Sequence, residues 1–347
     1  MTIIFTLCSN NYLAQARILA ASVRQHQPSW TFIIGLVDKK DAGIPYDSFG
    51  YEVIEMSGVE PGIDALAGKY NIIELNTCLK PTFFQYLFGP RNAEQVIYLD
   101  PDTRLYGPLE EVEKLLADQD IILTPHILSP IAQDGLFPDE PLFLNYGLYN
   151  LGFLALRRTG QTLRFLQWWK DRTYLKGYDL PAKGLFTDQL WINLAPLYFD
   201  KVWILRHPGY NMGPWNLHER SLKGRDGQFF LESGEPLAFY HFSNFKPAVP
   251  RLHGDYTRHT MAQRPDLRGL YDDYREEMRR EGYHQYSVMP CHYVAVHKEF
   301  LLRQQALLAE KEAGAGRALP FYKKMIRGLK AMLPLRLKRL AHALIKI

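Results

Sequence analysis

The chain has few cysteines and no long apolar run. Its 347 residues include three cysteines, Cys8, Cys78 and Cys291, at wide spacing and without a Cys-x-x-Cys pair. This pattern argues against a disulfide framework and against a thiolate metal site, so we expect buried free thiols. No apolar run reaches the roughly 18 residues that a membrane-spanning helix needs. The first residues also lack the basic segment of a signal peptide, and we expect a cytoplasmic protein.

Acidic residues are absent from the end of the chain. Residues 317–347 hold nine Lys or Arg side chains and no Asp or Glu, so removing them from the net charge of +4 leaves −5 for residues 1–316. The tail alternates bulky apolar and basic residues, which predicts peripheral binding to the anionic inner face of a membrane. A solvated helix packed on the body is the alternative. Because the body is acidic and shows no recognised binding module, we expect no nucleic-acid partner.

Apolar runs and helical periodicity alternate along the first part of the chain. We expect strands at residues 3–7, 31–37, 51–56 and 96–99, and helices at 12–25 and 65–88, the second broken at Pro81. This alternation predicts an α/β protein with a mostly parallel, doubly wound sheet and flanking helices.

The remainder of the chain is less regular. Strands are expected at 121–124 and 152–156, and helices at 163–174, 188–195, 267–280 and 300–312. Gly314 and Gly316 indicate a hinge before the basic tail.

Two carboxylates follow the strand expected at 96–99. Asp100 and Asp102 flank Pro101, which fixes the turn, and they come at the carboxyl end of the strand, where open α/β sheets bind ligands. Carboxylate oxygens favour Mg²⁺ or Mn²⁺, which usually complete their coordination with phosphate oxygens. A solvated pair of turn aspartates is the simpler alternative.

His241 comes just after a late apolar run that ends in Phe239 and Tyr240. Its imidazole could join the two carboxylates as a third ligand, and this softer donor favours Mn²⁺ somewhat over Mg²⁺. A hydrogen-bonded structural histidine is the alternative.

Five blocks occur in an order that resembles the retaining GT-A glycosyltransferases, most closely glycosyltransferase family 8 and bacterial relatives that build lipopolysaccharide or capsule glycans. The blocks are residues 9–22, 98–103, 149–153, 188–193 and 241–247. The resemblance covers about residues 2–250 and implies a GT-A catalytic domain over 1–250, with a nucleotide-sugar part at about 1–105 and an acceptor part at about 106–250. A helical extension (251–316) and the basic tail (317–347) would follow.

The resemblance implies a role for each matching residue. Asp100, Asp102 and His241 would be the ligands of Mn²⁺ or Mg²⁺, which would bridge the phosphates of a UDP-sugar donor. The residues expected around the donor's nucleotide are Leu7, Ser9, Asn10, Tyr12, Lys80, Asp100 and Lys246. Two departures are visible: Asn10 and Asn11 stand where the family often has acids, and the block at 241–247 is one residue shorter than usual and lacks its glycine and tryptophan.

Asn150, Asp188 and Gln189 would surround the donor sugar. The implied reaction is a transfer on one face of the sugar, in which the acceptor hydroxyl attacks beside the departing diphosphate; Asp188 or Gln189 as the nucleophile of a double displacement is the alternative. Structural alternatives remain for three residues: Lys80 as a solvated helix residue, Asn150 as a turn former and Asp188 as a helix cap. Trp215 is a candidate wall for the saccharide or lipid-linked glycan acceptor.

Three other functions compete with this reading. An inverting GT-A enzyme would need a general base such as Asp134, Asp139 or Glu140. A catalytically inactive protein that binds glycans or nucleotide sugars is the second. A sugar nucleotidylyltransferase is disfavoured because residues 8–12 contain no glycine for a phosphate loop.

Overall fold

The computed structural model describes residues 1–225, 228–249 and 251–318. Contacts divide the chain into two compact units, Met1–His297 and Lys298–Ile347, and residues 251–297 pack within the first. The prediction for the basic tail falls almost wholly on residues 319–347 and so lies outside the described residues.

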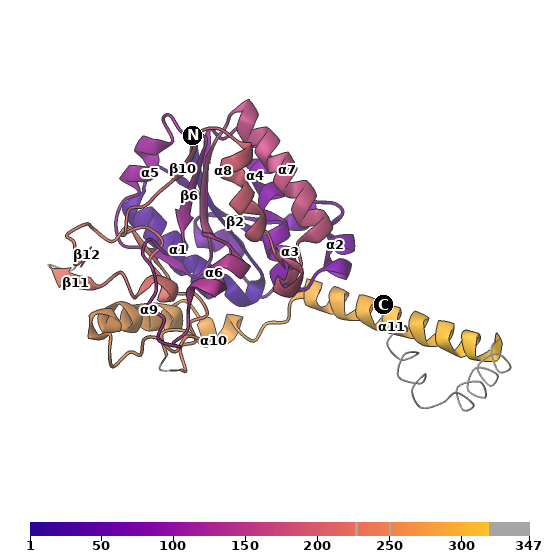
Figure 1. Ribbon diagram of the computed structural model, residues 1–347. Helices are drawn as coiled ribbons and strands as arrows, with labels where there is room; N and C mark the ends of the chain where they lie inside the picture. Colours follow the sequence, from indigo (N-terminus) through magenta and orange to yellow (C-terminus); the bar gives the residue numbers. More distant parts are fainter. Residues whose placement is uncertain (226–227, 250, 319–347) are drawn as a thin grey trace, which may run out of the picture. The chain divides into compact units, whose positions relative to one another are not determined.

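A seven-stranded sheet with the order β10-β6-β7-β4-β1-β2-β3 forms the centre of the first unit (Figure 1). Its strands are β1 (Thr2–Cys8), β2 (Thr31–Leu36), β3 (Glu52–Glu55), β4 (Gln95–Leu99), β6 (Ile121–Pro125), β7 (Tyr149–Arg157) and β10 (Val202–Ile204). All neighbours are parallel except β7, which is antiparallel to both β4 and β6. The prediction of a mostly parallel α/β sheet is confirmed.

Helices cover both faces of this sheet because its strands alternate in the face to which each side chain points. Ile4 and Leu99 pack toward α1 (Leu13–His26) and α5 (Glu110–Leu115). Phe5 and Tyr98 pack in the cluster on the other face. The helices of that face are α2 (Ile63–Lys69), α3 (Ile72–Cys78), α4 (Lys80–Phe88) and α7 (Gly160–Lys176).

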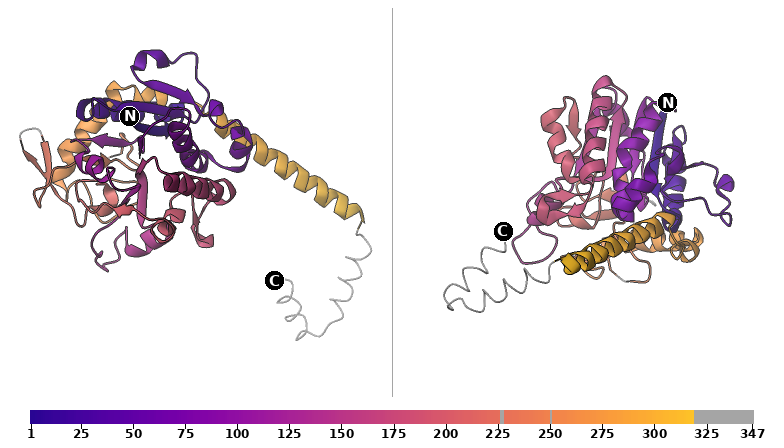
Figure 2. Two further views of the ribbon diagram at one scale, coloured as in Figure 1. Left: turned by 90° about the horizontal axis from the view of Figure 1, so that it is seen from above. Right: turned by 90° about the vertical axis from the view of Figure 1, so that its right-hand side faces the viewer.

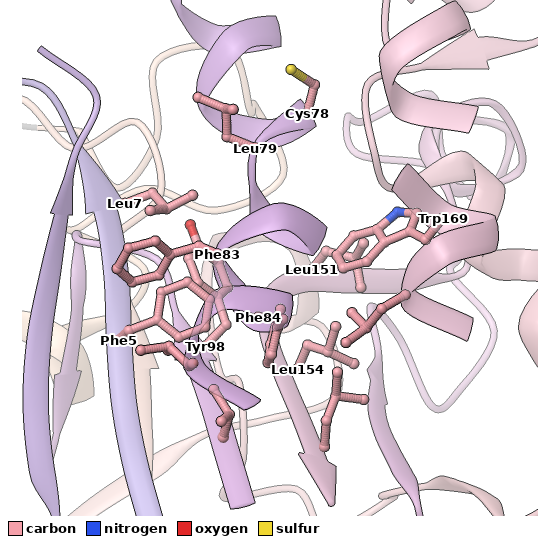
Figure 3. Packing of buried hydrophobic residues seen from close by; sticks show 14 of the residues in the cluster. Phe5, Leu7, Cys78, Leu79, Phe83, Phe84, Tyr98, Leu151, Leu154 and Trp169 are labelled. Atoms are coloured by element: carbon pink, nitrogen blue, oxygen red, sulfur yellow. The ribbon is translucent and has the colours of Figure 1, made fainter. Parts of the chain in front are cut away.

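Aromatic side chains fill the space between the sheet and α4. The ring of Phe5 lies 5.0 Å from Phe83, 4.8 Å from Phe84 and 5.0 Å from Tyr98, between centroids (Figure 3). Trp169 of α7 extends the cluster, with its ring 6.5 Å from Phe84. This packing fixes α4, and with it Lys80 at the start of the helix.

The helical region expected over residues 65–88, with one break at Pro81, consists of three helices, and the breaks between them fall at residues 70–71 and at Leu79. Asn71 starts α3 with a capping box, in which its side chain accepts from the amides of Ile73 and Glu74. Pro81 does not break a helix, because it lies in the first turn of α4, where a missing N–H costs nothing.

Short elements surround the sheet. The two-stranded pairs are β5 (Thr103–Leu105) with β13 (Phe239–His241), β8 (Asp179–Leu180) with β9 (Leu185–Phe186), and β11 (Leu222–Arg225) with β12 (Gln228–Leu231). The remaining α-helices are α6 (Glu140–Tyr146), α8 (Ala195–Tyr198), α9 (Arg268–Arg280), α10 (Tyr283–Tyr286) and α11 (His292–Ala318). Short 3-10 helices occupy Asn10–Tyr12, Tyr46–Phe49, Met56–Gly58, Pro181–Lys183, Leu190–Leu194, Pro214–Asn216 and Pro265–Leu267.

Helix α9 packs through one face. Leu270, Tyr271, Tyr274 and Met278 are its buried side chains, and the Tyr274 ring stacks on Phe242 with centroids 3.7 Å apart. Figure 2 shows α9 in orange beside the β11–β12 hairpin. Phe242 directly follows His241, so this helix supports the strand that carries the histidine.

Two further expectations differ from the structure. The helix expected at 188–195 is a 3-10 helix at Leu190–Leu194, followed by α8. The hinge expected at Gly314 and Gly316 is wrong, because α11 continues through both residues, and a glycine in a helix costs only about 1 kcal/mol relative to alanine.

All three cysteines are free thiols. Cys8 and Cys78 are buried free thiols, and Cys291 is free but only partly buried. Over the described ranges, no helix combines the length and the apolar character needed to cross a bilayer.

Candidate functional site

The two aspartates and His241 come together at one edge of the sheet. Asp100 follows β4, where its amide donates to the carbonyl of Gly152 at 2.9 Å. The antiparallel pairing of β5 and β13 places His241 opposite Thr103, next to Asp102. The Nε2 atom of His241 lies 3.0 Å from Oδ1 of Asp102 and 3.7 Å from Oδ2 of Asp100. One ligand atom from each residue lies within 4.8 Å of the others.

This donor set fits a divalent cation. The carboxylates remain partly open, with side-chain exposures of 27% for Asp100 and 20% for Asp102, whereas His241 is buried. Burial by itself would raise the pKa of Asp102, but the charge of His241 and its hydrogen bond outweigh it and lower that pKa. Burial likewise would lower the pKa of His241, and the two carboxylates raise it instead. Two carboxylate oxygens and one imidazole nitrogen are ligands that Mn²⁺ and Mg²⁺ accept.

Two small residues make room for the rings at this site. A Cβ on Gly152 would lie 2.5 Å from ring atoms of His241, so only glycine allows the imidazole to sit against β7. The indole of Trp215 meets His241 edge to face, with centroids 5.1 Å apart, and itself lies against Gly213. The imidazole is therefore held on two sides by packing.

Lys80 is a buried residue and not a solvated one. Its Nζ atom lies 3.1 Å from Oδ2 of Asp188 and 3.7 Å from Oδ1 of Asp100. It also donates to the carbonyl of Leu151 at 2.9 Å and lies over the ring of Tyr98. Burial would lower the pKa of Lys80, but Asp188 and Asp100 outweigh it and raise that pKa. The ammonium group thus carries a fixed positive charge between two carboxylates.

Asp188 does not cap a helix. Its Oδ1 atom accepts from the hydroxyl of Thr187 at 3.1 Å, and its backbone carbonyl accepts from the indole of Trp169 at 3.0 Å. Burial raises the pKa of Asp188 more than the neighbouring Lys80 lowers it. The carboxylate is therefore anchored from both ends, by Thr187 and by Lys80.

Asn150 and Gln189 use their amide groups to hold the start of β7. The Oδ1 atom of Asn150 accepts from the amide of Gly152 at 2.9 Å, and its Nδ2 atom donates to Nε2 of His126 at 3.1 Å. The Oε1 atom of Gln189 accepts from the amide of Leu151 at 2.9 Å. Its Nε2 atom donates to the carbonyl of Tyr146 at 2.8 Å. Asn150 thus lies in a strand and is not a turn former.

A cavity of about 570 Å³ joins most of the predicted site residues. Its lining includes Lys80, Asp100, Asp102, Asn150, Asp188, Gln189, Trp215 and His241. A second hollow of about 270 Å³ is lined by Leu7, Ser9 and Tyr12 together with Asp100 and Asp102. Asp102 also lines a third hollow, of about 160 Å³, which it shares with Lys246 and Tyr12. Asp102 therefore lies where the three hollows meet.

Asn10 lies outside all three hollows. Its Nδ2 atom donates to the carbonyl of Lys39 at 2.8 Å, and its Oδ1 atom accepts from the hydroxyl of Tyr46. The neighbouring Asn11 lines both smaller hollows instead.

Several residues of the site escaped the sequence analysis. Tyr98 donates to Oδ1 of Asp100, and its position two residues earlier on the strand placed both side chains on one face, a signal that was available. No pattern in the sequence indicated that Gly152 lies against His241 or that His126 bonds to Asn150. His253, Asp255 and Tyr256 also line the cavity of about 570 Å³, and they follow the last motif block in an irregular segment without periodicity.

Comparison with known proteins gives two relatives and several similar folds. No family model matches the chain. The uncharacterized protein YfnF of Bacillus subtilis (strain 168) is 29% identical over 170 residues, which cover 48% of this chain and 55% of YfnF. The uncharacterized protein YfnD of the same organism is 22% identical over 254 residues, or 69% of this chain and 76% of YfnD. The match to YfnF thus spans about half the length of that relative.

Three similar solved structures carry glycosyltransferase names. The galactosyltransferase LgtC in complex with donor and acceptor sugar analogs is 18% identical, with a TM-score of 0.48, over 84% of this chain and 98% of LgtC. The bifunctional glycosyltransferase WbbM in its apo form is 13% identical, with a TM-score of 0.48, over 87% of this chain and 51% of WbbM. GlyE of Streptococcus pneumoniae TIGR4 is 15% identical, with a TM-score of 0.45, over 87% of this chain and 63% of GlyE.

Proposed function

We propose that the protein is a metal-dependent retaining GT-A glycosyltransferase of the family 8 type. It would move a hexose-type sugar from a UDP-sugar to a glycan or glycolipid acceptor in cell-surface polysaccharide synthesis. One observation carries the proposal: a single cavity holds a three-ligand cation site beside the buried Lys80 and Asp188 pair and the two fixed amides of Asn150 and Gln189. The acceptor would be a saccharide or a lipid-linked glycan, reached from the cytoplasm at the inner face of the membrane.

The cation, held by Asp100, Asp102 and His241, would supply charge stabilisation to the departing diphosphate. Lys80 adds a second positive charge that cannot move away, because its ammonium group is buried and paired. Lys246, exposed beside the hollow that Asp102 also lines, would contact the diphosphate from the solvent side. The nucleotide would occupy the hollow lined by Leu7, Ser9 and Tyr12.

Transfer on one face of the sugar agrees best with these contacts. The bond from the anomeric carbon to the diphosphate oxygen breaks, the bond to the acceptor oxygen forms, and the acceptor's proton passes to the diphosphate oxygen. A double displacement would need a free nucleophile, but Asp188 is paired with Lys80 and both ends of the Gln189 amide are bonded to the backbone. Asp188 would hold donor hydroxyls, and Gln189 would fix the strand beside the anomeric carbon.

The three carboxylates considered for an inverting reaction have other contacts. Asp134 pairs with Arg258 at 2.8 Å, Asp139 caps α6 at the amide of Leu142, and Glu140 accepts from Gln133 at 3.2 Å. The cavity of about 570 Å³ that holds Asp100, Asp102 and His241 is lined by none of them, and Glu140 lines a separate cavity of about 780 Å³. These contacts weigh against the inverting alternative.

A donor panel tests the proposal directly. UDP-, GDP- and ADP-sugars are incubated with the protein in Mn²⁺ or in EDTA, and nucleotide release and thermal stabilisation are measured. We expect release from one UDP-sugar that EDTA abolishes. Silence across the panel, without any stabilisation, would favour a binding protein.

Asp102→Ala separates the cation site from the fold. Because Asp102 supplies one of three ligands, we expect the variant to lose Mn²⁺-dependent release while it keeps its thermal transition. Asp118→Ala, which changes an exposed aspartate, serves as the matched control. Full activity of Asp102→Ala would contradict the metal assignment.

A further inference from the structure

Residues 253–256 contribute an aromatic wall to the cavity of about 570 Å³ that holds Asp100, Asp102 and His241. His253 and Tyr256 stack with their ring centroids 3.7 Å apart and their planes 18° apart. Phe137 meets the Tyr256 ring at 5.5 Å, and both line the cavity together with Asp255. The wall thus combines flat apolar faces with one carboxylate, and no step of the proposed reaction uses it.

A buried arginine holds this wall in place. The guanidinium of Arg258 donates to both carboxylate oxygens of Asp134, at 2.8 and 2.9 Å, and to the carbonyls of Pro138 and Leu136 at 3.1 and 2.9 Å. The amide of Thr257 donates to the carbonyl of Phe137 at 2.8 Å. The segment is therefore fixed to the loop that carries Phe137 before any ligand binds.

The charges around the cavity are mostly negative. Asp179 and Asp255 line it in addition to Asp100, Asp102 and Asp188. Among the described residues of the lining, Lys80 is the single Lys or Arg, and it already pairs with Asp188 and Asp100. Burial lowers the pKa of His253 to about 4, so its imidazole is neutral at pH 7. An acidic sugar on this wall would meet carboxylates, and the described lining offers it no unpaired Lys or Arg side chain.

We infer that residues 253–256 form the acceptor subsite and that this subsite takes an uncharged saccharide in preference to a uronic acid. The inference rests on the proposed function, since an acceptor exists only if the protein transfers a sugar. Aromatic faces pack against the C–H faces of sugar rings, and a carboxylate accepts hydrogen bonds from hydroxyls. Arg258 is a positioning residue for this wall.

Saturation-transfer NMR on the full chain, loaded with UDP and the diamagnetic cation Mg²⁺, tests the subsite. The probes are the methyl glycosides of glucose, galactose and mannose, with the matched methyl glucuronide and galacturonide. We expect transfer to at least one neutral glycoside and several-fold less to its uronide. Tyr256→Ala should weaken the neutral glycoside about tenfold, the equivalent of about 1.4 kcal/mol. Tyr256→Leu, which keeps most of the side-chain volume, should also weaken it.

Tyr198→Ala is the matched control, because Tyr198 is 57% exposed and lies outside the cavity lining. Three results would overturn the subsite: uronides bound as well as neutral glycosides, no glycoside bound by the loaded wild type, or wild-type binding by both Tyr256 variants. Calorimetry of UDP binding in the presence of Mn²⁺ distinguishes failure of the proposed function from failure of the acceptor subsite. If UDP does not bind, the proposed function fails, whereas UDP binding without the expected glycoside pattern contradicts the subsite alone.

Discussion

Gly152 fixes the position of the imidazole of His241. A methyl group there would lie 2.5 Å from two ring atoms of His241 and 2.7 Å from Oδ1 of Asn150. All three distances are shorter than a van der Waals contact, so the methyl group would clash. Since Trp215 blocks the ring on another side, the imidazole has no room to retreat without leaving the carboxylates.

We therefore expect Gly152→Ala to weaken Mn²⁺ binding about tenfold or more, because the displaced imidazole no longer reaches the cation. A tenfold loss corresponds to about 1.4 kcal/mol of binding free energy. Calorimetry or the electron paramagnetic resonance of free Mn²⁺ measures this without any substrate. Gly269→Ala is the control, because a Cβ at Gly269 meets no atom within 4 Å. Equal Mn²⁺ affinity in both variants would show that the imidazole does not depend on Gly152.

Lys80 contributes to stability as well as to charge. Its removal leaves the buried Asp188 without its partner, and breaking a buried pair from one side costs about 3–5 kcal/mol. We expect Lys80→Met to lower the free energy of unfolding by this order, and Lys80→Met with Asp188→Asn to recover part of it. Chemical denaturation measures both. The exposed Lys114→Met should change little, and an equally small effect of Lys80→Met would contradict the buried pair.

At the scale of elements, the strand ends could be predicted and the loops could not. The apolar run before Asp100 placed both carboxylates at the ligand edge of the sheet, and the short run before His241 did the same for the imidazole. These predictions rest on residue patterns within one element. Lys80, in contrast, is buried because α4 packs on Phe5 and the Lys80 ammonium group lies over the ring of Tyr98, and the sequence of α4 alone does not reveal these contacts.

The irregular segment 253–258 is the part of the site that was least predictable from the sequence. Arg258 forms its contacts with residues more than a hundred positions earlier, and no local pattern records such a pairing. If this pairing places the aromatic wall, Arg258→Ala should raise the KM for a neutral acceptor about tenfold, with a much smaller change in kcat. Steady-state kinetics with the donor found in the panel measures the two constants separately. Arg268→Ala, at the start of α9, is the control, and an equal change in both constants would indicate a general structural effect.

At the scale of the whole molecule, buried histidines link stability to pH. Burial lowers the pKa of His126 to about 4, against an ordinary value of 6.5 in the unfolded chain. Between pH 6.5 and about pH 4, the unfolded state therefore binds a proton at His126 that the folded state does not bind. This stability is fully present above pH 6.5 and is lost as the pH falls toward 4, by about 2 kcal/mol at pH 5.

We accordingly expect urea denaturation to show a smaller free energy of unfolding at pH 5 than at pH 7. His126→Gln should reduce this difference, because it removes one titrating group. An unchanged pH dependence in the variant would exclude His126 as a source.

The basic tail is also a property of the whole chain, and we keep it as a prediction. Deletion of residues 317–347 removes nine positive charges, each contributing about 1 kcal/mol near an anionic surface. We expect the truncated protein to lose binding to vesicles of anionic lipid and to keep activity on soluble acceptors. Co-sedimentation with anionic and with neutral vesicles measures this, and equal sedimentation of both proteins would exclude the tail as the membrane contact.

The antiparallel direction of β7 limits which insertions and deletions the site can tolerate. Asn150 and Gly152 lie at the beginning of their strand, while Asp100 follows the end of β4, yet the antiparallel register pairs Leu99 with Phe153 and brings both to one edge. Because side chains alternate between faces, insertion or loss of one residue that shifted this register would exchange the faces of Asn150 and its neighbours. Length changes upstream, in the connection between β6 and β7, are tolerable only where the loop absorbs them. The register between β4 and β7 therefore sets the positions of Asn150 and Gly152 relative to Asp100.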